Sequence, residues 1–225
     1  MQSDGTDPKL LTDESEIALY PTVSPDGQYI VYVSNRAGNW NIWRMDVDGR
    51  HKLQLTTTSG IDTSPNCSPD GQSVVYTSWR SGKPALWKVS LDGGDSIQLT
   101  HKPSQLPIVS PDNRYIACFY HDEQPNSSWA LAIVPFDSGT PIKRFDQIAF
   151  GSIVRWHPSG LALTYANGRS DSDVWNQSLS GASLVRLTDF REKIIFGFDW
   201  SPDGKNLALV RGINVSDAVL LEDNN

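Results

Sequence analysis

A four-residue motif, Ser-Pro-Asp-Gly, recurs along the chain and constrains its fold more than any other feature. The first residues of successive copies lie 44, 42, 47 and 44 positions apart. Self-similarity at a period of about 40 to 45 residues is typical of repeat architectures. The 225 residues therefore divide into five repeats. The copies are Ser24-Pro25-Asp26-Gly27, Ser68-Pro69-Asp70-Gly71, Ser110-Pro111-Asp112-Asn113, the degenerate His157-Pro158-Ser159-Gly160, and Ser201-Pro202-Asp203-Gly204.

Each repeat is predicted to form four short antiparallel strands. In the first repeat, β-branched and aromatic residues favour strands at 18–23, 29–33, 41–45 and 52–56. The pair Asp48-Gly49 is a hairpin signal between the last two, because both residues tolerate positive φ. No segment shows helical periodicity. The sequence thus predicts an all-β fold, a β-propeller of about five four-stranded blades.

The Ser-Pro-Asp-Gly motif has the chemistry of a tight turn. Proline pre-sets φ at its position, and glycine takes a left-handed conformation before the next strand. Asn113 replaces glycine in the third copy, and asparagine tolerates that conformation well. The motif is therefore predicted to connect the first and second strands of each blade.

The two ends of the chain resemble complementary parts of one repeat. Residues 4–12 match the second tight turn and the fourth strand of the first repeat, whereas residues 217–222 match a third strand. We therefore expect a closing blade built from both termini, which would leave no exposed sheet edge. Residues 1–225 are predicted to form a single monomeric propeller domain, which is either cytosolic or a piece cut from a longer parent protein.

Two further residue types recur at fixed repeat positions. Trp43, Trp87 and Trp175 share a slot in the third strand, and a ring that recurs once per repeat is expected to pack one sheet on the next. Arg36, Arg80 and Arg169 share the turn after the second strand. We interpret them as donors of charge-assisted bonds to a neighbouring loop, with a shared anion site as the alternative.

Composition excludes several classes of function. The formal net charge is −7 and no window clusters Lys or Arg, so direct nucleic-acid binding is not expected. No run of 18 apolar residues occurs, which predicts no membrane insertion, and the N-terminus lacks the pattern of a signal peptide. Cys67 and Cys118 are predicted to be buried free thiols.

Motifs for catalysis, metal binding and cofactor binding are missing from the sequence. It contains no G-x-S-x-G, H-E-x-x-H, C-x-x-C or P-loop motif. The four histidines, His51, His101, His121 and His157, lie in separate repeats, and the first three are expected at the rim. We therefore predict no catalytic residue, no metal ligand and no cofactor.

Any binding site is expected at the mouth of the central channel, where first strands converge. Asp62 and Asp199 are candidates to hold a cation there, and Arg155 is a candidate to pair with Asp199 across the channel. Ordinary channel water explains such polar residues equally well. The polar candidates at this position are Asp62, Ser64, Asn66, Arg155 and Asp199.

The whole repeat resembles the TolB-type propeller repeat, also described as a WD-like "PD" repeat. The resemblance rests on Ser-Pro-Asp-Gly, the segment 34–38, Ile42-Trp43, the segment 46–49 and Leu55-Thr56. It covers nearly the whole chain, with departures at Asn113, at the His157 turn and in the insertion 122–128. It implies a bacterial, non-catalytic interaction protein, because the family's TolB is periplasmic and works with an outer-membrane lipoprotein. Similar propellers end bacterial membrane-anchored kinases and winged-helix regulators.

Three hypotheses about function follow. The first is a non-catalytic binding or sensing module that docks a protein or peptide on the channel face. The second is a propeller-type hydrolase or lyase acting at the central channel, and the third is a structural domain that positions a neighbouring module. Fold alone does not choose among them. The resemblance favours a periplasmic or extracytoplasmic location, with the cytoplasm as the alternative.

Overall fold

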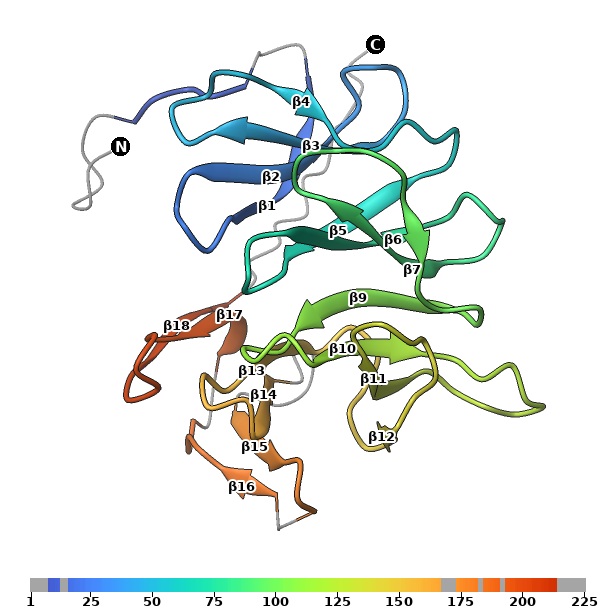
Figure 1. Cartoon of the computed structure of the whole chain (residues 1–225). Helices are drawn as coiled ribbons and strands as arrows, with labels where there is room; N and C mark the ends of the chain where they lie inside the picture. Colours follow the sequence, from blue (N-terminus) through green and yellow to red (C-terminus); the bar gives the residue numbers. More distant parts are fainter. Residues whose placement is uncertain (1–7, 13–15, 167–172, 182–183, 191–192, 214–225) are drawn as a thin grey trace, which may run out of the picture. The chain divides into compact units, whose positions relative to one another are not determined.

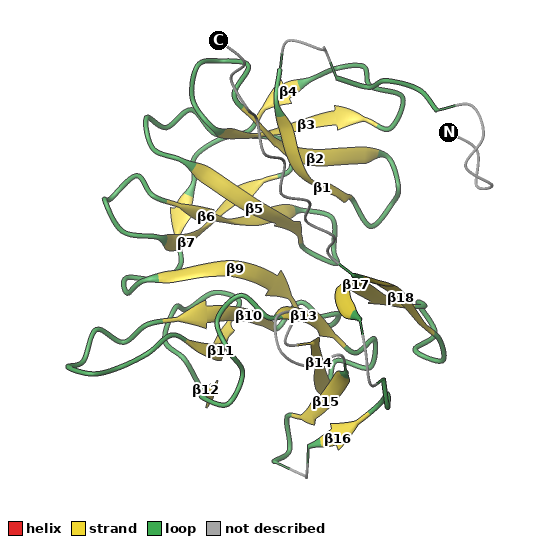
Figure 2. Ribbon diagram, turned by 180° about the vertical axis from the view of Figure 1, so that it is seen from behind, coloured by secondary structure: helices red, strands yellow, loops and turns green. Residues whose placement is uncertain are grey.

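The computed structural model describes residues 8–12, 16–166, 173–181, 184–190 and 193–213. The chain divides into two compact parts, Met1–Phe150 and Gly151–Asn225. Within the described ranges, every regular element is a β-strand and every sheet is antiparallel (Figure 1, Figure 2). The predicted all-β fold of propeller type is confirmed.

The first part contains three four-stranded blades (Figure 1). Blade 1 consists of β1 (Ala18–Val23), β2 (Tyr29–Ser34), β3 (Asn41–Asp46) and β4 (Leu53–Gln54). Blade 2 consists of β5 (Asp62–Cys67), β6 (Ser73–Ser78), β7 (Ala85–Ser90) and β8 (Ile97–Gln98). Blade 3 consists of β9 (Ser104–Val109), β10 (Tyr115–Tyr120), β11 (Ala130–Pro135) and β12 (Lys143–Phe145).

The second part contains one four-stranded blade and one strand pair among its described residues. Blade 4 consists of β13 (Ile153–Trp156), β14 (Ala162–Ala166), β15 (Val174–Ser178) and β16 (Val185–Arg186). The pair consists of β17 (Ile194–Trp200) and β18 (Leu207–Gly212). The strand predicted at residues 217–222 lies outside the described residues, so the closing blade and the single domain remain predictions.

The fourth strand is shorter than the sequence predicts. Its ladder is limited to β4, whereas the prediction ran from 52 to 56. Beyond β4 the chain still bonds to β3: the backbone N–H of Leu55 donates to the Ile42 carbonyl at 2.8 Å. The hydroxyl of Thr56 accepts the Ile42 N–H at 3.0 Å. A side-chain acceptor thus replaces the last ladder bond, which is why the regular strand ends early.

Apolar side chains pack between neighbouring blades of the first part. Val31, Val33 and Ile42 of blade 1 form one buried cluster with residues of blade 2. The blade 2 members include Val74, Tyr76 and Val89, which are 0%, 0% and 1% exposed. A second cluster joins blade 2 to blade 3 in the same way. The core is therefore a series of sheet-on-sheet interfaces, each made by alternate residues of the facing strands.

The Ser-Pro-Asp-Gly turn closes through a small network of bonds. In the first copy, the Ser24 hydroxyl donates to the Asp26 carboxylate at 2.5 Å and accepts the Tyr29 N–H at 2.9 Å. The same carboxylate accepts the Gln28 N–H at 3.0 Å. Equivalent bonds recur in the three other copies that keep Ser and Asp. The serine and aspartate side chains therefore stabilise each of these four turns through hydrogen bonds within the turn.

The last position of the motif is left-handed in all five copies. Gly27 has φ of 71°, and Asn113, the one exception to glycine, has φ of 59°. This confirms the prediction that Asn113 adopts the left-handed conformation of the glycine that it replaces. The Asn113 amide also donates to Asp70 in the preceding turn at 2.8 Å, a bond between blades that glycine could not make.

Acid is expected to weaken these turns through their aspartates. The hydrogen bond from Ser24, followed by that from the Gln28 N–H, lowers the pKa of Asp26 below its ordinary 3.8. Because the folded pKa lies below the unfolded one, Asp26 stabilises the fold above the unfolded pKa, and this contribution is lost as pH falls through the folded value. Asp26→Asn should therefore flatten the fall in unfolding free energy as the pH drops below about 4. Urea denaturation at a series of pH values measures this change.

The matched control is Asp95→Asn, the same change at an exposed aspartate in the turn between β7 and β8. It should leave the acid slope unaltered. Equal slopes for the wild-type protein and Asp26→Asn would contradict the role given to the turn carboxylate.

Candidate functional site

The first strands of the first part lie next to one another. β5 contacts both β1 and β9, and each of these strands forms one edge of its own blade. We call this surface, made of β1, β5 and β9, the first-strand edge. It is where the sequence predicts the binding residues of this part of the chain.

Each strand of the first-strand edge contains a bulge with a left-handed residue. The residues are Tyr20, Ser64 and Leu106, with φ of 52°, 52° and 57°. Pairing with the second strand shifts register at this point in every case. Left-handed backbone is costly for residues other than glycine, and such strain is concentrated at functional sites.

A proline follows each of these residues, and this signal was missed in the sequence. Pro21, Pro65 and Pro107 occupy the same repeat position. Proline has no N–H and is tolerated only on edge strands or at bulges. The repeated Xaa-Pro dipeptide could therefore have predicted both the bulge and the edge position of the first strand.

Asp62 begins β5 and is fully buried. One carboxylate oxygen accepts the Thr58 hydroxyl at 3.0 Å and lies 3.9 Å from the Arg80 guanidinium. The other oxygen, Oδ1, has no hydrogen-bond partner among the described residues. Asp62 thus acts as the internal partner of Arg80, and its predicted role as a ligand remains a prediction.

Ser64 and Asn66 lie further along the same strand. Ser64 is the left-handed residue of the bulge and is partly exposed. The Asn66 side chain accepts the Val109 N–H of blade 3 at 2.8 Å, so it ties two neighbouring first strands together. The Ser64 hydroxyl lies 3.4 Å from that of its neighbour Thr63.

Arg155 and Asp199 belong to the second part. The Arg155 Nε lies 3.8 Å from an Asp199 carboxylate oxygen, so the two side chains pair, whereas pairing across a channel stays a prediction. It joins β13 to β17, the first strands of consecutive repeats. Both side chains are substantially exposed, and such a pair is worth little in stability.

The recurring arginines pair with carboxylates that lie at or just before the start of the first strand. The Arg36 Nε lies 3.5 Å from Glu16, two residues before β1, and the Arg80 guanidinium lies 3.9 Å from Asp62, the first residue of β5. This supports the predicted charge-assisted pairing, and a shared anion site stays an untested alternative. Arg169 lies outside the described residues.

The same arginines also cover the recurring tryptophans. The Arg80 guanidinium lies 3.9 Å from the ring centroid of Trp87, and Arg36 lies 5.1 Å from that of Trp43. Trp87 packs against the cluster between blades 1 and 2, as predicted for a sheet-packing ring. Stacking of the two residue types was not foreseen, although their constant spacing in the repeat carries the signal.

The insertion 122–128 is held by charge. The Asp122 carboxylate accepts a bond from Arg144 at 2.5 Å. Hydrogen bonds from the Gln124 N–H, Ser127 and Arg144 lower its pKa to about 2. The loop is therefore fixed to blade 3 at neutral pH.

Neither cysteine forms a disulfide, and His51 pairs with a nearby aspartate. Both cysteines are free thiols; burial raises the pKa of each to about 12, although Cys67 is only partly buried. His51 pairs with Asp46 at 2.6 Å next to β4, and its predicted rim position stays a prediction. Among the described ranges, no three His, Cys, Asp or Glu side chains are grouped to hold a metal ion. Those ranges also contain no helix able to span a membrane.

Repeated four-stranded blades with turns of this kind define a propeller of the Ser-Pro-Asp-Gly class. The family model "TolB beta propeller domain" matches residues 5–138, more than half of the chain. The chain therefore belongs to the TolB β-propeller family.

One named relative is similar in sequence over a short stretch of the chain, and others are similar in fold. "Tol-Pal system protein TolB" of Roseobacter denitrificans is 49% identical over 47 residues, which is 21% of this chain and 11% of that protein. The crystal structure of TolB from Acinetobacter baumannii matches with a TM-score of 0.67 at 18% identity, over 93% of this chain and 58% of that one. The chain thus spans well under two thirds of these relatives.

A second structural relative is an enzyme. The oligogalacturonate lyase from Vibrio parahaemolyticus matches with a TM-score of 0.57 at 15% identity, over 88% of this chain and 72% of that one. At this identity both structural matches show a shared fold and nothing about chemistry.

Proposed function

We propose that this chain is a non-catalytic binding module that holds a protein or peptide partner at the first-strand edge. Membership of the TolB β-propeller family supports an interaction role. The observation that carries the proposal is the left-handed residue repeated on β1, β5 and β9. These three residues lie within strands and not in turns, and backbone strain of this kind is concentrated at functional sites.

The chemistry of this edge suits a peptide better than a small charged ligand. Tyr20 is 56% exposed and Leu19 is 41% exposed, so β1 offers apolar surface together with a phenol hydroxyl. Ser64 adds a hydroxyl on β5. Aromatic anchors with adjacent polar groups are typical of protein interfaces.

Site-specific cross-linking tests this proposal. A photoreactive residue in place of Ser64 should give a discrete adduct in cells of the source bacterium, whereas the same residue at Asp95 should not. Calorimetry with the purified partner should then show that Ser64→Trp weakens binding at least about tenfold, the effect of losing about 1.4 kcal/mol. Asp95→Trp is the control for an added ring.

Two results would contradict the proposal. Absence of any Ser64-specific adduct would favour a structural domain that positions a neighbouring module. Release of unsaturated products from oligogalacturonate by the purified chain would instead establish a propeller-type lyase.

We further propose a periplasmic location, on the family resemblance. The curated relative is named as a Tol-Pal system protein, which supports an extracytoplasmic role. Cell fractionation of the native protein tests this, and recovery with cytoplasmic markers would contradict it.

A further inference from the structure

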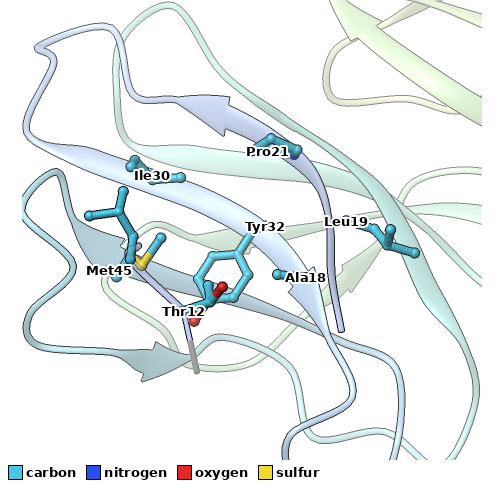
Figure 3. Close-up of a pocket in the computed structure, with 8 residues that line it drawn as sticks. Thr12, Ala18, Leu19, Pro21, Ile30, Tyr32 and Met45 are labelled. Carbon is cyan, nitrogen blue, oxygen red and sulfur yellow. The ribbon is translucent and has the colours of Figure 1, made fainter. Parts of the chain in front are cut away.

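Two local features of the first part differ in their chemistry. One is a groove of about 220 Å³ on blade 1, between residues 11–12 and the face of β1, β2 and β3 (Figure 3). No charged side chain is among the described residues that line it. The other is the insertion 122–128 of blade 3, which contains two carboxylates and directly follows His121. The insertion is therefore the feature with a neighbouring group that can change charge near neutral pH.

The insertion lies at the end of β10 next to the start of β9. Residues 121–129 connect β10 to β11, a longer connection than residues 35–40 of blade 1 or 79–84 of blade 2. Tyr120, the last residue of β10, pairs with Ser104, the first residue of β9. The insertion thus lies beside the beginning of the first-strand edge in blade 3.

Ionic contacts hold the insertion to two blades. The Asp122 carboxylate accepts a bond from Arg144 of blade 3, and Lys102 Nζ donates to the Asp122 carbonyl at 2.8 Å. The Glu123 carboxylate is bound by Lys83, which lies just before β7 in blade 2. The insertion therefore bridges blades 2 and 3 through its first two residues.

Glu123 has a strained backbone. Its φ of 61° lies in the left-handed region, which is costly for a residue with a side chain. Its backbone N–H donates to Nδ1 of His121 at 3.1 Å, and its carboxylate is bound by Lys83. Strain of this kind persists only where surrounding contacts hold the residue in place. The bond to His121 is therefore one of the contacts that keep Glu123 in this conformation.

The contacts of the His121 ring define its protonation state. Nδ1 accepts the Glu123 N–H, so it must carry a lone pair. Nε2 lies 3.2 Å from the Ser127 carbonyl oxygen, which can only accept, so Nε2 must donate. The ring is therefore the neutral tautomer with its proton on Nε2. A second proton would sit on Nδ1 and face the Glu123 N–H, which places two donors against each other.

Charged groups of both signs surround the ring. The Trp129 ring packs against it, with centroids 5.6 Å apart. The cations near the loop do not favour a second proton, whereas each carboxylate is already bound by a cation. The charged residues of the loop and of the elements that contact it are Asp122, Glu123, Lys83, Lys102 and Arg144.

The two carboxylates stay ionised in mild acid. A hydrogen bond from the Gln124 N–H is the first cause that lowers the pKa of Asp122 to about 2. The hydrogen bond from Lys83 is the first cause that lowers the pKa of Glu123 below its ordinary value. Lysine and arginine stay charged throughout this range. From about pH 7.5 to about pH 5, His121 is therefore the group at this loop whose charge changes.

We propose that His121 is a proton-sensitive latch for the insertion 122–128. The neutral ring holds Glu123 in its left-handed conformation and so keeps the insertion closed over blades 2 and 3. A second proton on Nδ1 removes the acceptor of the Glu123 N–H, and residues 123–126 then relax away from the ring. Asp122 stays bound to Arg144, so the loop opens from one end. This inference goes beyond the proposed binding role and does not depend on it.

Amide exchange of the full chain, followed by NMR, tests the latch. The protection factor of the Glu123 N–H, which is corrected for the intrinsic effect of pH, should fall at least about tenfold from about pH 7.5 to about pH 5. The backbone N–H of His121 donates to the Pro103 carbonyl at 2.9 Å and should keep its protection. Nitrogen shifts of the ring should show the proton on Nε2 at the higher pH.

His121→Asn is the matched variant. The asparagine side-chain oxygen can accept the Glu123 N–H in place of Nδ1 but takes no proton in this range, so Glu123 protection should be the same at both pH values. His101→Asn, at an exposed histidine between β8 and β9, should leave the wild-type response intact. Three results would overturn the proposal: unchanged Glu123 protection in the wild-type chain, the same fall in His121→Asn, or an equal fall at the backbone N–H of His121.

Discussion

Arg80→Met is expected to lower the free energy of unfolding by about 2–3 kcal/mol, because it leaves a buried carboxylate without its cation. Asp62 is fully buried, and Arg80 lies 3.9 Å from it. Arg80 also donates to the Tyr76 hydroxyl at 2.6 Å and to the Ser78 hydroxyl at 3.0 Å. Chemical denaturation of the full chain measures the loss.

The repeat supplies a matched control for this prediction. Arg36→Met removes the equivalent arginine of blade 1, but Glu16 keeps Lys52 at 3.4 Å. Its cost should therefore stay below about 1 kcal/mol. Adding Asp62→Asn to Arg80→Met should restore part of the stability, since the neutral amide needs no counter-charge. Equal costs for the two arginines would show that Asp62 is not the reason.

Leu86→Ala should lower the free energy of unfolding by about 3 kcal/mol, through lost burial and a residual cavity. Leu86 is 0% exposed and packs in the cluster that joins blades 2 and 3, with Ile116 and Val134 as neighbours. The change in urea midpoint measures it. Ile97→Ala, at a residue that is 59% exposed, should change stability by less than about 0.5 kcal/mol. A cost for Leu86→Ala below about 1 kcal/mol would contradict the assigned packing.

Most of the fold follows from local sequence signals. The Ser-Pro-Asp-Gly turn carries its own hydrogen-bond donors and acceptors, so its position and its left-handed last residue could be predicted one repeat at a time. Alternating β-branched residues then located the strands to within a few positions. The fourth strand was overestimated because Thr56 completes the pairing through its side chain, which pattern alone does not distinguish from a ladder bond.

The candidate site was less predictable, because its polar residues are bound by other parts of the fold. Asp62 and Asn66 looked like ligands since they are polar and near the expected channel. The structure gives each a partner that is distant in sequence, Arg80 for Asp62 and the Val109 N–H for Asn66. The Asn66 pairing depends on how neighbouring sheets meet, which single-repeat reasoning does not contain, whereas Asp62 and Arg80 belong to the same blade. The Xaa-Pro bulge was visible in the sequence and was overlooked.

That bulge limits how the proposed partner could be recognised. Each of Pro21, Pro65 and Pro107 removes a main-chain donor from an edge strand, and the left-handed residue before it turns the backbone out of the extended path. An incoming peptide therefore cannot extend these sheets by regular strand addition, the mode that reads main chain alone. Binding at this edge must depend on side chains, which can change without disturbing a blade. Substitution at the three left-handed positions of the first-strand edge could therefore change the partner, while the turns and the interfaces between blades stay the same.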